Sequence, residues 1–120
     1  GPGSASASGA RASLADILSR KGEWREANEL IDAVYADELA RFGPTHPVVI
    51  VMLSKQGDLA AREGKYDIAE RRYRAAAQAA GKVFGEQHPD PLRHWAHVAM
   101  VMAEAGKTQE ALDLFQRIIP

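Results

Sequence analysis

The segment GKYDIAERRYRAA, residues 64–76, decides the fold of this chain. It begins with a glycine, and its aromatic and small side chains then follow at intervals of three and four residues: Tyr66, Ala69, Tyr73 and Ala76. Such intervals place these side chains on one face of a helix. Similar segments begin at Gly22 and Gly106, each 42 residues from Gly64. The chain therefore contains a repeated helix that follows a glycine turn.

A second marker has the same period. FGPTHP at residues 42–47 recurs as FGEQHP at residues 84–89, again 42 residues later. In both copies His-Pro predicts the start of a helix, because proline at the first helical position gives up only an amide that has no partner. A fixed period of this length indicates a solenoid of stacked hairpins. We expect an all-α fold of six helices in three antiparallel hairpins, with helices near 10–20, 24–41, 47–62, 66–83, from 89, and 108–119.

The repeats suggest where the domain begins and ends. Residues 1–4 are typical of the scar left by a removed expression tag, and the small, polar residues 5–9 are expected to be a flexible lead-in. Residues 10–120 then form the repeat domain, with repeats at about 10–45, 46–87 and 88–120, the last of them incomplete. In the first helix we expect Leu14, Ala15 and Leu18 to face the core. Gly57 lies inside a predicted helix, which indicates close approach of a neighbouring helix.

Composition narrows the possible functions. The 120 residues carry 15 Lys and Arg against 16 Asp and Glu, so no global field favours nucleic acid or an anionic membrane. There is no cysteine, which excludes disulfides and thiolate chemistry and fits a reducing compartment. No apolar run is long enough for a membrane span, and no signal peptide is visible. We expect a cytoplasmic protein that binds neither nucleic acid nor membrane.

The repeated residues resemble the tetratricopeptide repeat (TPR), in its 42-residue variant typified by kinesin light chains. The middle copy carries the family pattern nearly in full, through Gly43, His46-Pro47, Leu53, Gly57, Gly64-Lys65-Tyr66, Ala69 and Tyr73. The resemblance covers about residues 10–120. It implies a right-handed superhelix whose concave surface is lined by the first helix of each hairpin. That surface is the family's usual site for an extended or helical peptide, so the resemblance implies a protein-interaction scaffold and not an enzyme.

The register of the family also implies which residues line the groove. Corresponding positions of the three first helices carry Ser13, Lys55 and His97; Asp16, Asp58 and Met100; and Arg20, Arg62 and Glu104. Arg93 lies one turn before His97. The asparagines that usually grip a peptide backbone in this family are absent from these positions.

Two interpretations of these charges remain open. The basic side chains could form a strip that receives an acidic or mixed-charge peptide: Arg20, Lys55, Arg62, Arg93 and His97. Alternatively, Asp16–Arg20 and Asp58–Arg62 are ordinary i,i+4 pairs on a solvated helix face. Two further functions also remain open: stacking or self-association through incomplete terminal repeats, and service as a regulatory domain of a larger protein.

The sequence favours no chemistry beyond binding. Four histidines are present, but His46 and His88 start different helices, and His94 and His97 have no third ligand near them in sequence. No nucleophile elbow or phosphate-binding glycine loop occurs. We therefore expect no catalytic residue, metal or cofactor. Trp24 and Trp95 fall on apolar stripes and are predicted to lie in the core.

Overall fold

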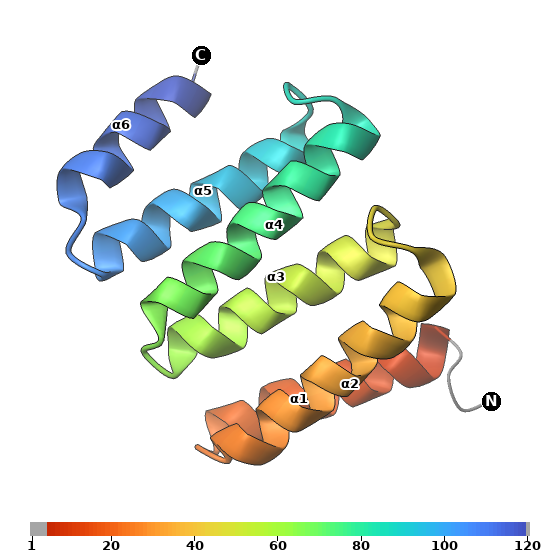
Figure 1. The fold of residues 1–120 in the computed structure, drawn as a ribbon. Helices are drawn as coiled ribbons and strands as arrows, with labels where there is room; N and C mark the ends of the chain where they lie inside the picture. The colour runs from red at the N-terminus through yellow and green to blue at the C-terminus, as the bar shows by residue number, and fades with distance from the viewer. Residues whose placement is uncertain (1–4, 120) are drawn as a thin grey trace.

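The computed structural model describes residues 5–119, and these residues form a stack of helical hairpins (Figure 1). The described helices are α1 (Ala5–Arg20), α2 (Trp24–Phe42), α3 (Pro47–Arg62), α4 (Tyr66–Phe84), α5 (Pro89–Glu104) and α6 (Thr108–Ile118). The predicted all-α hairpin solenoid is confirmed. The predicted tag scar at residues 1–4 lies outside the described residues. The predicted flexible lead-in at residues 5–9 is wrong, because α1 already begins at Ala5.

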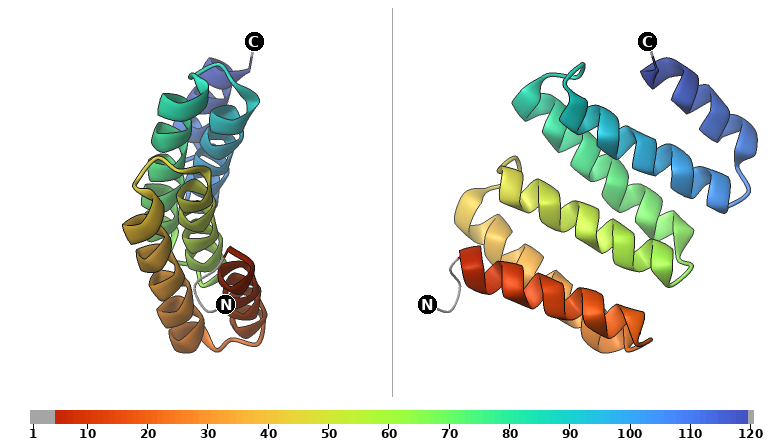
Figure 2. Two further views of the ribbon diagram at one scale, coloured as in Figure 1. Left: turned by 90° about the vertical axis from the view of Figure 1, so that its right-hand side faces the viewer. Right: turned by 180° about the vertical axis from the view of Figure 1, so that it is seen from behind.

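The helices form two layers (Figure 2). The first helices of the hairpins, α1, α3 and α5, lie in one layer, and α2, α4 and α6 lie in the other. The molecule is thin in one direction, with principal extents of 44 × 32 × 16 Å. In the part of the chain that the structure describes, no helix is long and apolar enough to cross a membrane.

The glycine turns between the helices of each hairpin have the backbone conformation that the sequence predicts. Gly22, Gly64 and Gly106 have φ values of 82°, 84° and 90°. Residues that carry a Cβ atom rarely adopt this backbone conformation. The helix after each turn then buries an alanine at the same register, and these alanines are at most 3% exposed: Ala27, Ala69 and Ala111. The absence of larger side chains there lets the two helices of each hairpin approach closely.

The His-Pro segments start α3 and α5, as predicted, and each histidine also caps its helix. Nδ1 of His46 accepts a hydrogen bond from the amide of Val48 at 3.1 Å, and Nδ1 of His88 accepts one from Asp90 at 3.0 Å. Each ring stacks on a phenylalanine of the preceding helix, with ring centroids 4.4 Å and 5.0 Å apart. These two histidines therefore have a structural role at the turns.

Gly57 marks the close contact inside the second hairpin. A Cβ atom at this position would lie 2.7 Å from Cε1 of Tyr73 on α4. The close approach predicted for Gly57 is confirmed, and the approaching group is the ring of Tyr73. That ring also reaches the next hairpin, since its centroid lies 5.0 Å from that of His97 on α5.

The first helix packs differently from the prediction. Ala12 and Ala15 are buried, but Leu14, expected on the core face, is 49% exposed. Near the start of α1, the hydroxyl of Ser8 donates a hydrogen bond to Oε1 of Glu38 on α2, and both side chains are buried. In the second hairpin the corresponding positions are Ile50 and Ala80, which pack in one apolar cluster. A polar pair thus replaces an apolar contact in the first hairpin.

Candidate peptide-binding face

We use the name first-helix face for the outward stripes of α1, α3 and α5. On α3 the outward stripe has i, i+4, i+7, i+11 spacing, because most of the positions between these residues are buried. Counterparts 42 residues away give the stripes of α1 and α5. The face contains every predicted groove residue together with Val51 and Glu104: Ser13, Asp16, Arg20, Val51, Lys55, Asp58, Arg62, Arg93, His97, Met100 and Glu104.

Asp16 is the centre of the charge network on this face. Its carboxylate lies 2.9 Å from Nε of Arg20 and 2.9 Å from Nη1 of Arg62, which comes from the next hairpin. Hydrogen bonds from these two guanidinium groups, that from Arg20 first, lower the pKa of Asp16. The predicted Asp16–Arg20 pair is confirmed. Because the groups are substantially exposed, each pair contributes about 0–1 kcal/mol.

The predicted Asp58–Arg62 pair is wrong. Arg62 extends to the first hairpin, where Nη1 also donates to the hydroxyl of Ser19. Asp58 instead accepts a hydrogen bond from the hydroxyl of Tyr73. Burial of the ring, followed by this contact with Asp58, raises the pKa of Tyr73. Two residues one turn apart thus connect to different neighbouring helices.

Arg93 and His97, which the sequence places one turn apart on one face of the helix, do not converge. Nη2 of Arg93 lies 2.5 Å from Oδ1 of Asp90 on its own helix. The ring of His97 packs against Tyr73, and its Nδ1 is buried without a hydrogen-bond partner. The described geometry therefore shows no shared binding position for the two groups.

His94 faces the interior and not the first-helix face. It is 3% exposed, and its Nε2 lies 3.3 Å from Oδ2 of Asp90, so the expectation of no possible third ligand nearby in sequence is wrong: this carboxylate lies four residues before His94. Burial lowers the pKa of His94, which opposes the effect of Asp90. Its ring centroid lies 6.2 Å from that of His97. Among residues 5–119 no group of three or more His, Asp or Glu side chains is placed to hold a metal ion.

With these pairs assigned, the middle of the face has an apolar and a basic component. Val51 is 45% exposed and Met100 is 52% exposed. Lys55 lies between them in the register, and no ion pair involves its ammonium group among the described residues. Sequence reasoning did not identify Val51, although its position four residues before Lys55 places it on the same stripe.

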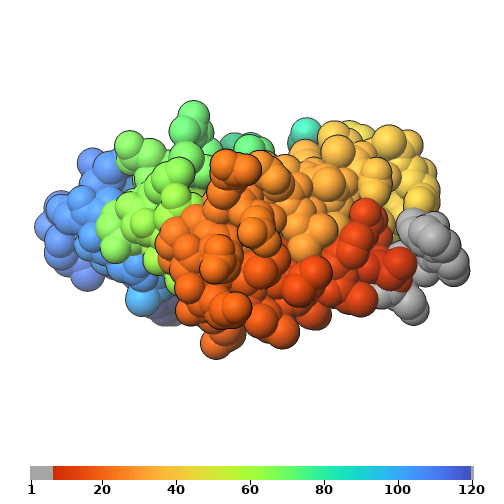
Figure 3. Space-filling view, turned by 90° about the horizontal axis from the view of Figure 1, so that it is seen from below, coloured from red at the N-terminus to blue at the C-terminus, as the bar shows by residue number. Residues whose placement is uncertain are grey.

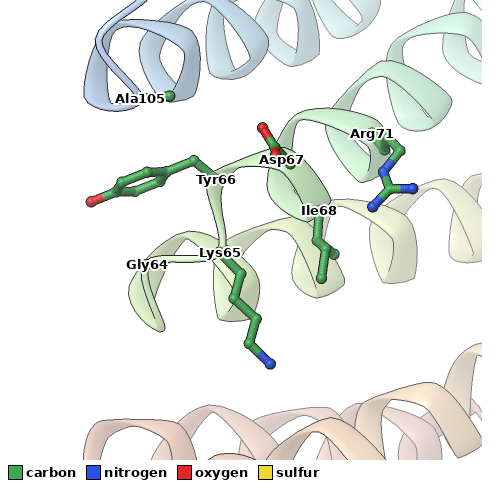
Figure 4. Close-up of a pocket in the computed structure, with 7 residues that line it drawn as sticks. All are labelled: Gly64, Lys65, Tyr66, Asp67, Ile68, Arg71 and Ala105. Carbon is green, nitrogen blue, oxygen red and sulfur yellow. The ribbon is translucent and has the colours of Figure 1, made fainter.

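One surface hollow is lined by residues other than those of the first-helix face. It has a volume of about 500 Å³ beside the α3–α4 turn (Figure 4). Its lining includes Lys65, Tyr66, Arg71 and Ala105. Figure 4 shows the charged ends of Lys65 and Arg71 apart from each other, and Lys65 is already paired with Glu63 at 2.8 Å. We therefore find no converging set of polar groups in this hollow.

The comparisons with known proteins agree with this geometry. Two crystal structures of nearly identical TPR-like repeats from Podosopora anserina, described as those of a kinesin light chain, superpose with TM-scores of 0.79 and 0.78. One of them carries a point substitution. Each is 21% identical to this chain and covers 92% of it, whereas the chain covers only 52% of each solved structure. The chain thus spans about half the length of those structures.

No curated protein matches the sequence. The family model of the tetratricopeptide repeat matches residues 48–120, which is more than half of the chain. TPR repeats are in general protein–protein interaction modules. The chain therefore belongs to the tetratricopeptide repeat family, and its fold resembles that of the kinesin-light-chain-like repeats.

Proposed function

We propose that this chain binds a peptide or a helix of a partner protein on its first-helix face. The observation that carries the proposal is the exposure of Val51 and Met100, which share the first-helix face with Lys55. Large apolar side chains exposed on neighbouring helices lose water contact when a partner covers them, which stabilises a complex. Membership of a family of interaction modules supports the same conclusion.

The charge distribution favours a partner that is mainly apolar and carries an acidic group. Asp16 compensates both Arg20 and Arg62, and Asp90 compensates Arg93. The wide basic strip suggested by the sequence is therefore reduced, with Lys55 as its uncompensated cation. We propose that Lys55 pairs with a carboxylate of the partner, while Val51 and Met100 contact apolar side chains on either side.

Selection of peptides from a random library tests this proposal. Peptides that bind the protein would be measured again with a Lys55→Glu, Met100→Glu variant, whose helical content is checked by circular dichroism. Binding should weaken at least about tenfold, because the variant removes an ion pair and places a carboxylate in an apolar contact. A matched variant, Lys21→Glu with Leu112→Glu, makes one lysine-to-glutamate and one apolar-to-glutamate substitution away from Val51, Lys55 and Met100 and should bind normally. Selected peptides with equal affinity for both variants would remove the first-helix face from consideration.

A second candidate function is stacking on another repeat or on a second copy. Leu14 and Ile17 on α1 are 49% and 57% exposed. Their counterparts on α3 and α5 are buried against the preceding hairpin and at most 6% exposed: Gln56, Leu59, Val98 and Val101. Figure 3 shows α1 and α2 facing the viewer at this end of the stack. Sedimentation of wild type and of a Leu14→Lys, Ile17→Lys variant tests the self-association form; identical monomeric behaviour over a wide concentration range would count against it.

A further inference from the structure

The hydroxyl of Tyr73 reaches the first-helix face from the other layer of the structure. Tyr73 lies on α4 and is 6% exposed, yet its hydroxyl donates a hydrogen bond to Oδ1 of Asp58 on the outward stripe of α3. Burial raises the pKa of Tyr73, so the hydroxyl keeps its proton at neutral pH and acts as the donor. The ring approaches α3 at Gly57, where a Cβ atom would lie 2.7 Å from Cε1. The glycine therefore lets a buried tyrosine hold a carboxylate of the face.

The first hairpin shows what the corresponding carboxylate does without a tyrosine. The counterparts of Asp58, Arg62 and Tyr73, 42 residues earlier, are Asp16, Arg20 and Ile31. Isoleucine has no hydroxyl, and the carboxylate of Asp16 lies 2.9 Å from Nε of Arg20, four residues later. Asp58 also has an arginine four residues later, yet it takes part in no ion pair among residues 5–119. A hydroxyl that competes for this carboxylate is present in the second hairpin and absent from the first.

The carboxylate that Tyr73 holds lies between two cations of the face. Lys55 precedes Asp58 by three residues and Arg62 follows it by four, intervals at which side chains on a helix surface are neighbours. Arg62 already contacts Asp16 and Ser19 of the first hairpin. The ammonium group of Lys55 takes part in no ion pair within the part of the chain that the structure describes. Lys55 is therefore the cation with which a released Asp58 would pair.

We propose that Tyr73 is a specificity-determining residue of the first-helix face, because its hydroxyl holds Asp58 and leaves Lys55 free to pair with a carboxylate of the partner. This inference rests on the proposed function and names a residue that acts on the same face from the opposite helix layer. Tyr73 is buried, so it acts through Asp58 and Lys55 and not by touching the partner. Without the hydroxyl, Asp58 turns to Lys55, and the face binds acidic peptides less well.

The expected effect on peptide binding is moderate. The probe is an acidic peptide selected from the random library, one that binds the wild type and loses affinity when Lys55 is replaced in Lys55→Glu. An exposed ion pair between Asp58 and Lys55 is weak, so it competes with the peptide carboxylate without excluding it. A Tyr73→Phe substitution, which keeps the ring and removes the hydroxyl, should therefore weaken binding about threefold.

Acetylation of the folded protein tests the pairing without any peptide. The protein is treated with a small amount of acetic anhydride, and the modification of Lys55 is followed by mass spectrometry. A neighbouring carboxylate favours the ammonium form of a lysine, which does not react, so Lys55 should be acetylated at least about twofold more slowly in Tyr73→Phe than in the wild type. Lys21, in the turn of the first hairpin, is the internal reference and should react equally in both proteins.

A second substitution separates this role of Tyr73 from a purely structural one. Tyr73→Phe also removes a hydrogen bond between two helices, so it lowers the free energy of unfolding whatever its effect on Lys55. Adding Asp58→Asn removes the charge that Tyr73→Phe releases. The double variant should therefore regain both the acetylation rate of Lys55 and the peptide affinity of the wild type. Tyr35→Phe removes a hydroxyl from α2 and should change neither quantity, and circular dichroism checks that every variant is folded.

The outcomes separate this inference from the proposed function. Equal acetylation of Lys55 in the wild type and in Tyr73→Phe would overturn the inference, and so would a slower reaction that Asp58→Asn does not restore. Unchanged affinity of Tyr73→Phe for a selected peptide that Lys55→Glu no longer binds would also overturn it. If no selected peptide binds the wild type through this face, the proposed function fails, whereas the acetylation rates still decide whether Tyr73 keeps Asp58 from Lys55.

Discussion

The buried Ser8–Glu38 contact allows a quantitative test of how the first hairpin is held together. Ser8 is 2% exposed, Glu38 is 0% exposed, and the Ser8 hydroxyl donates to Oε1 of Glu38. The other carboxyl oxygen, Oε2, is buried without a hydrogen-bond partner. A Ser8→Ala substitution removes the one hydrogen bond that this carboxyl group makes among the described residues.

The expected loss follows from these contacts. A buried polar group that loses its partner costs about 1–3 kcal/mol, so Ser8→Ala should lower the free energy of unfolding by about 2 kcal/mol. The double variant Ser8→Ile, Glu38→Ala should behave differently, because it recreates the Ile50–Ala80 contact of the second hairpin. Replacing a buried polar pair with apolar residues of similar total volume is often neutral or stabilising. The double variant should therefore be at least as stable as the wild type.

Urea denaturation followed by far-ultraviolet circular dichroism measures both effects. Ser13→Ala on the same helix is the matched control, since Ser13 is exposed, and its effect should stay within about 0.5 kcal/mol. Two results together would refute this reasoning: a Ser8→Ala variant with an unchanged free energy of unfolding, and a double variant that is less stable than the wild type. They would mean that Ser8 and Glu38 do not occupy positions that apolar residues can fill as they do in the second hairpin.

Three further perturbations test other contacts. Gly57→Ala should lower the free energy of unfolding by about 1–3 kcal/mol in urea titrations, because the new Cβ atom would lie 2.7 Å from the ring of Tyr73. Burial lowers the pKa of His94 below 6.5, so this side chain binds a proton more tightly in the unfolded chain than in the folded one. The free energy of unfolding should therefore fall as the pH decreases from about 6.5 toward the pKa of His94 in the folded state. His94→Met copies its counterpart Met52, and thermal melts across this range should show a weaker pH dependence. Asp16→Asn should cost less than about 2 kcal/mol, because it weakens two exposed ion pairs of about 0–1 kcal/mol each, and added salt should reduce the difference.

The turns of this fold can be predicted from sequence because they depend on local conformation. Gly64 adopts a positive φ, and His46 with Pro47 starts a helix, whatever lies around them. These signals recur every 42 residues and therefore predict the number, order and approximate bounds of the helices. Gly57 could also be interpreted, since a glycine inside a helix needs a close neighbour to compensate its cost.

Contacts between hairpins were predicted less well. The local spacing favoured an Asp58–Arg62 pair, but Arg62 instead contacts Asp16, 46 residues earlier in the chain. A local pattern does not show that the folded chain brings the carboxylate of Asp16, which is distant in sequence, closer to Arg62 than the carboxylate of Asp58 one turn away. Likewise, Leu14 has the spacing of a core residue, yet its position faces a side of α1 on which the described chain places no hairpin.

The contacts of Ser8, Glu38 and the two tryptophans also depend on residues that are distant in sequence, so a local pattern does not predict them. A serine in a small, polar segment gives no local sign of a carboxyl partner 30 residues away. Trp24 and Trp95 were predicted as core residues; both are only half-buried, although Trp95 packs against a core cluster. Tyr35 packs beside Leu53 in the second hairpin, whereas the corresponding residue near Trp95 is the small Ala77, and this difference becomes relevant only after the hairpins are stacked.

The most direct test of the proposed function is to map a bound peptide onto the protein by nuclear magnetic resonance. A peptide selected from the random library would be added to ¹⁵N-labelled protein, and amide shift changes would be recorded. We predict changes on the outward stripes of α3 and α5, centred on Lys55, His97 and Met100, which disappear in the Lys55→Glu, Met100→Glu variant. Shift changes confined to other surfaces, or retained in that variant, would contradict the account.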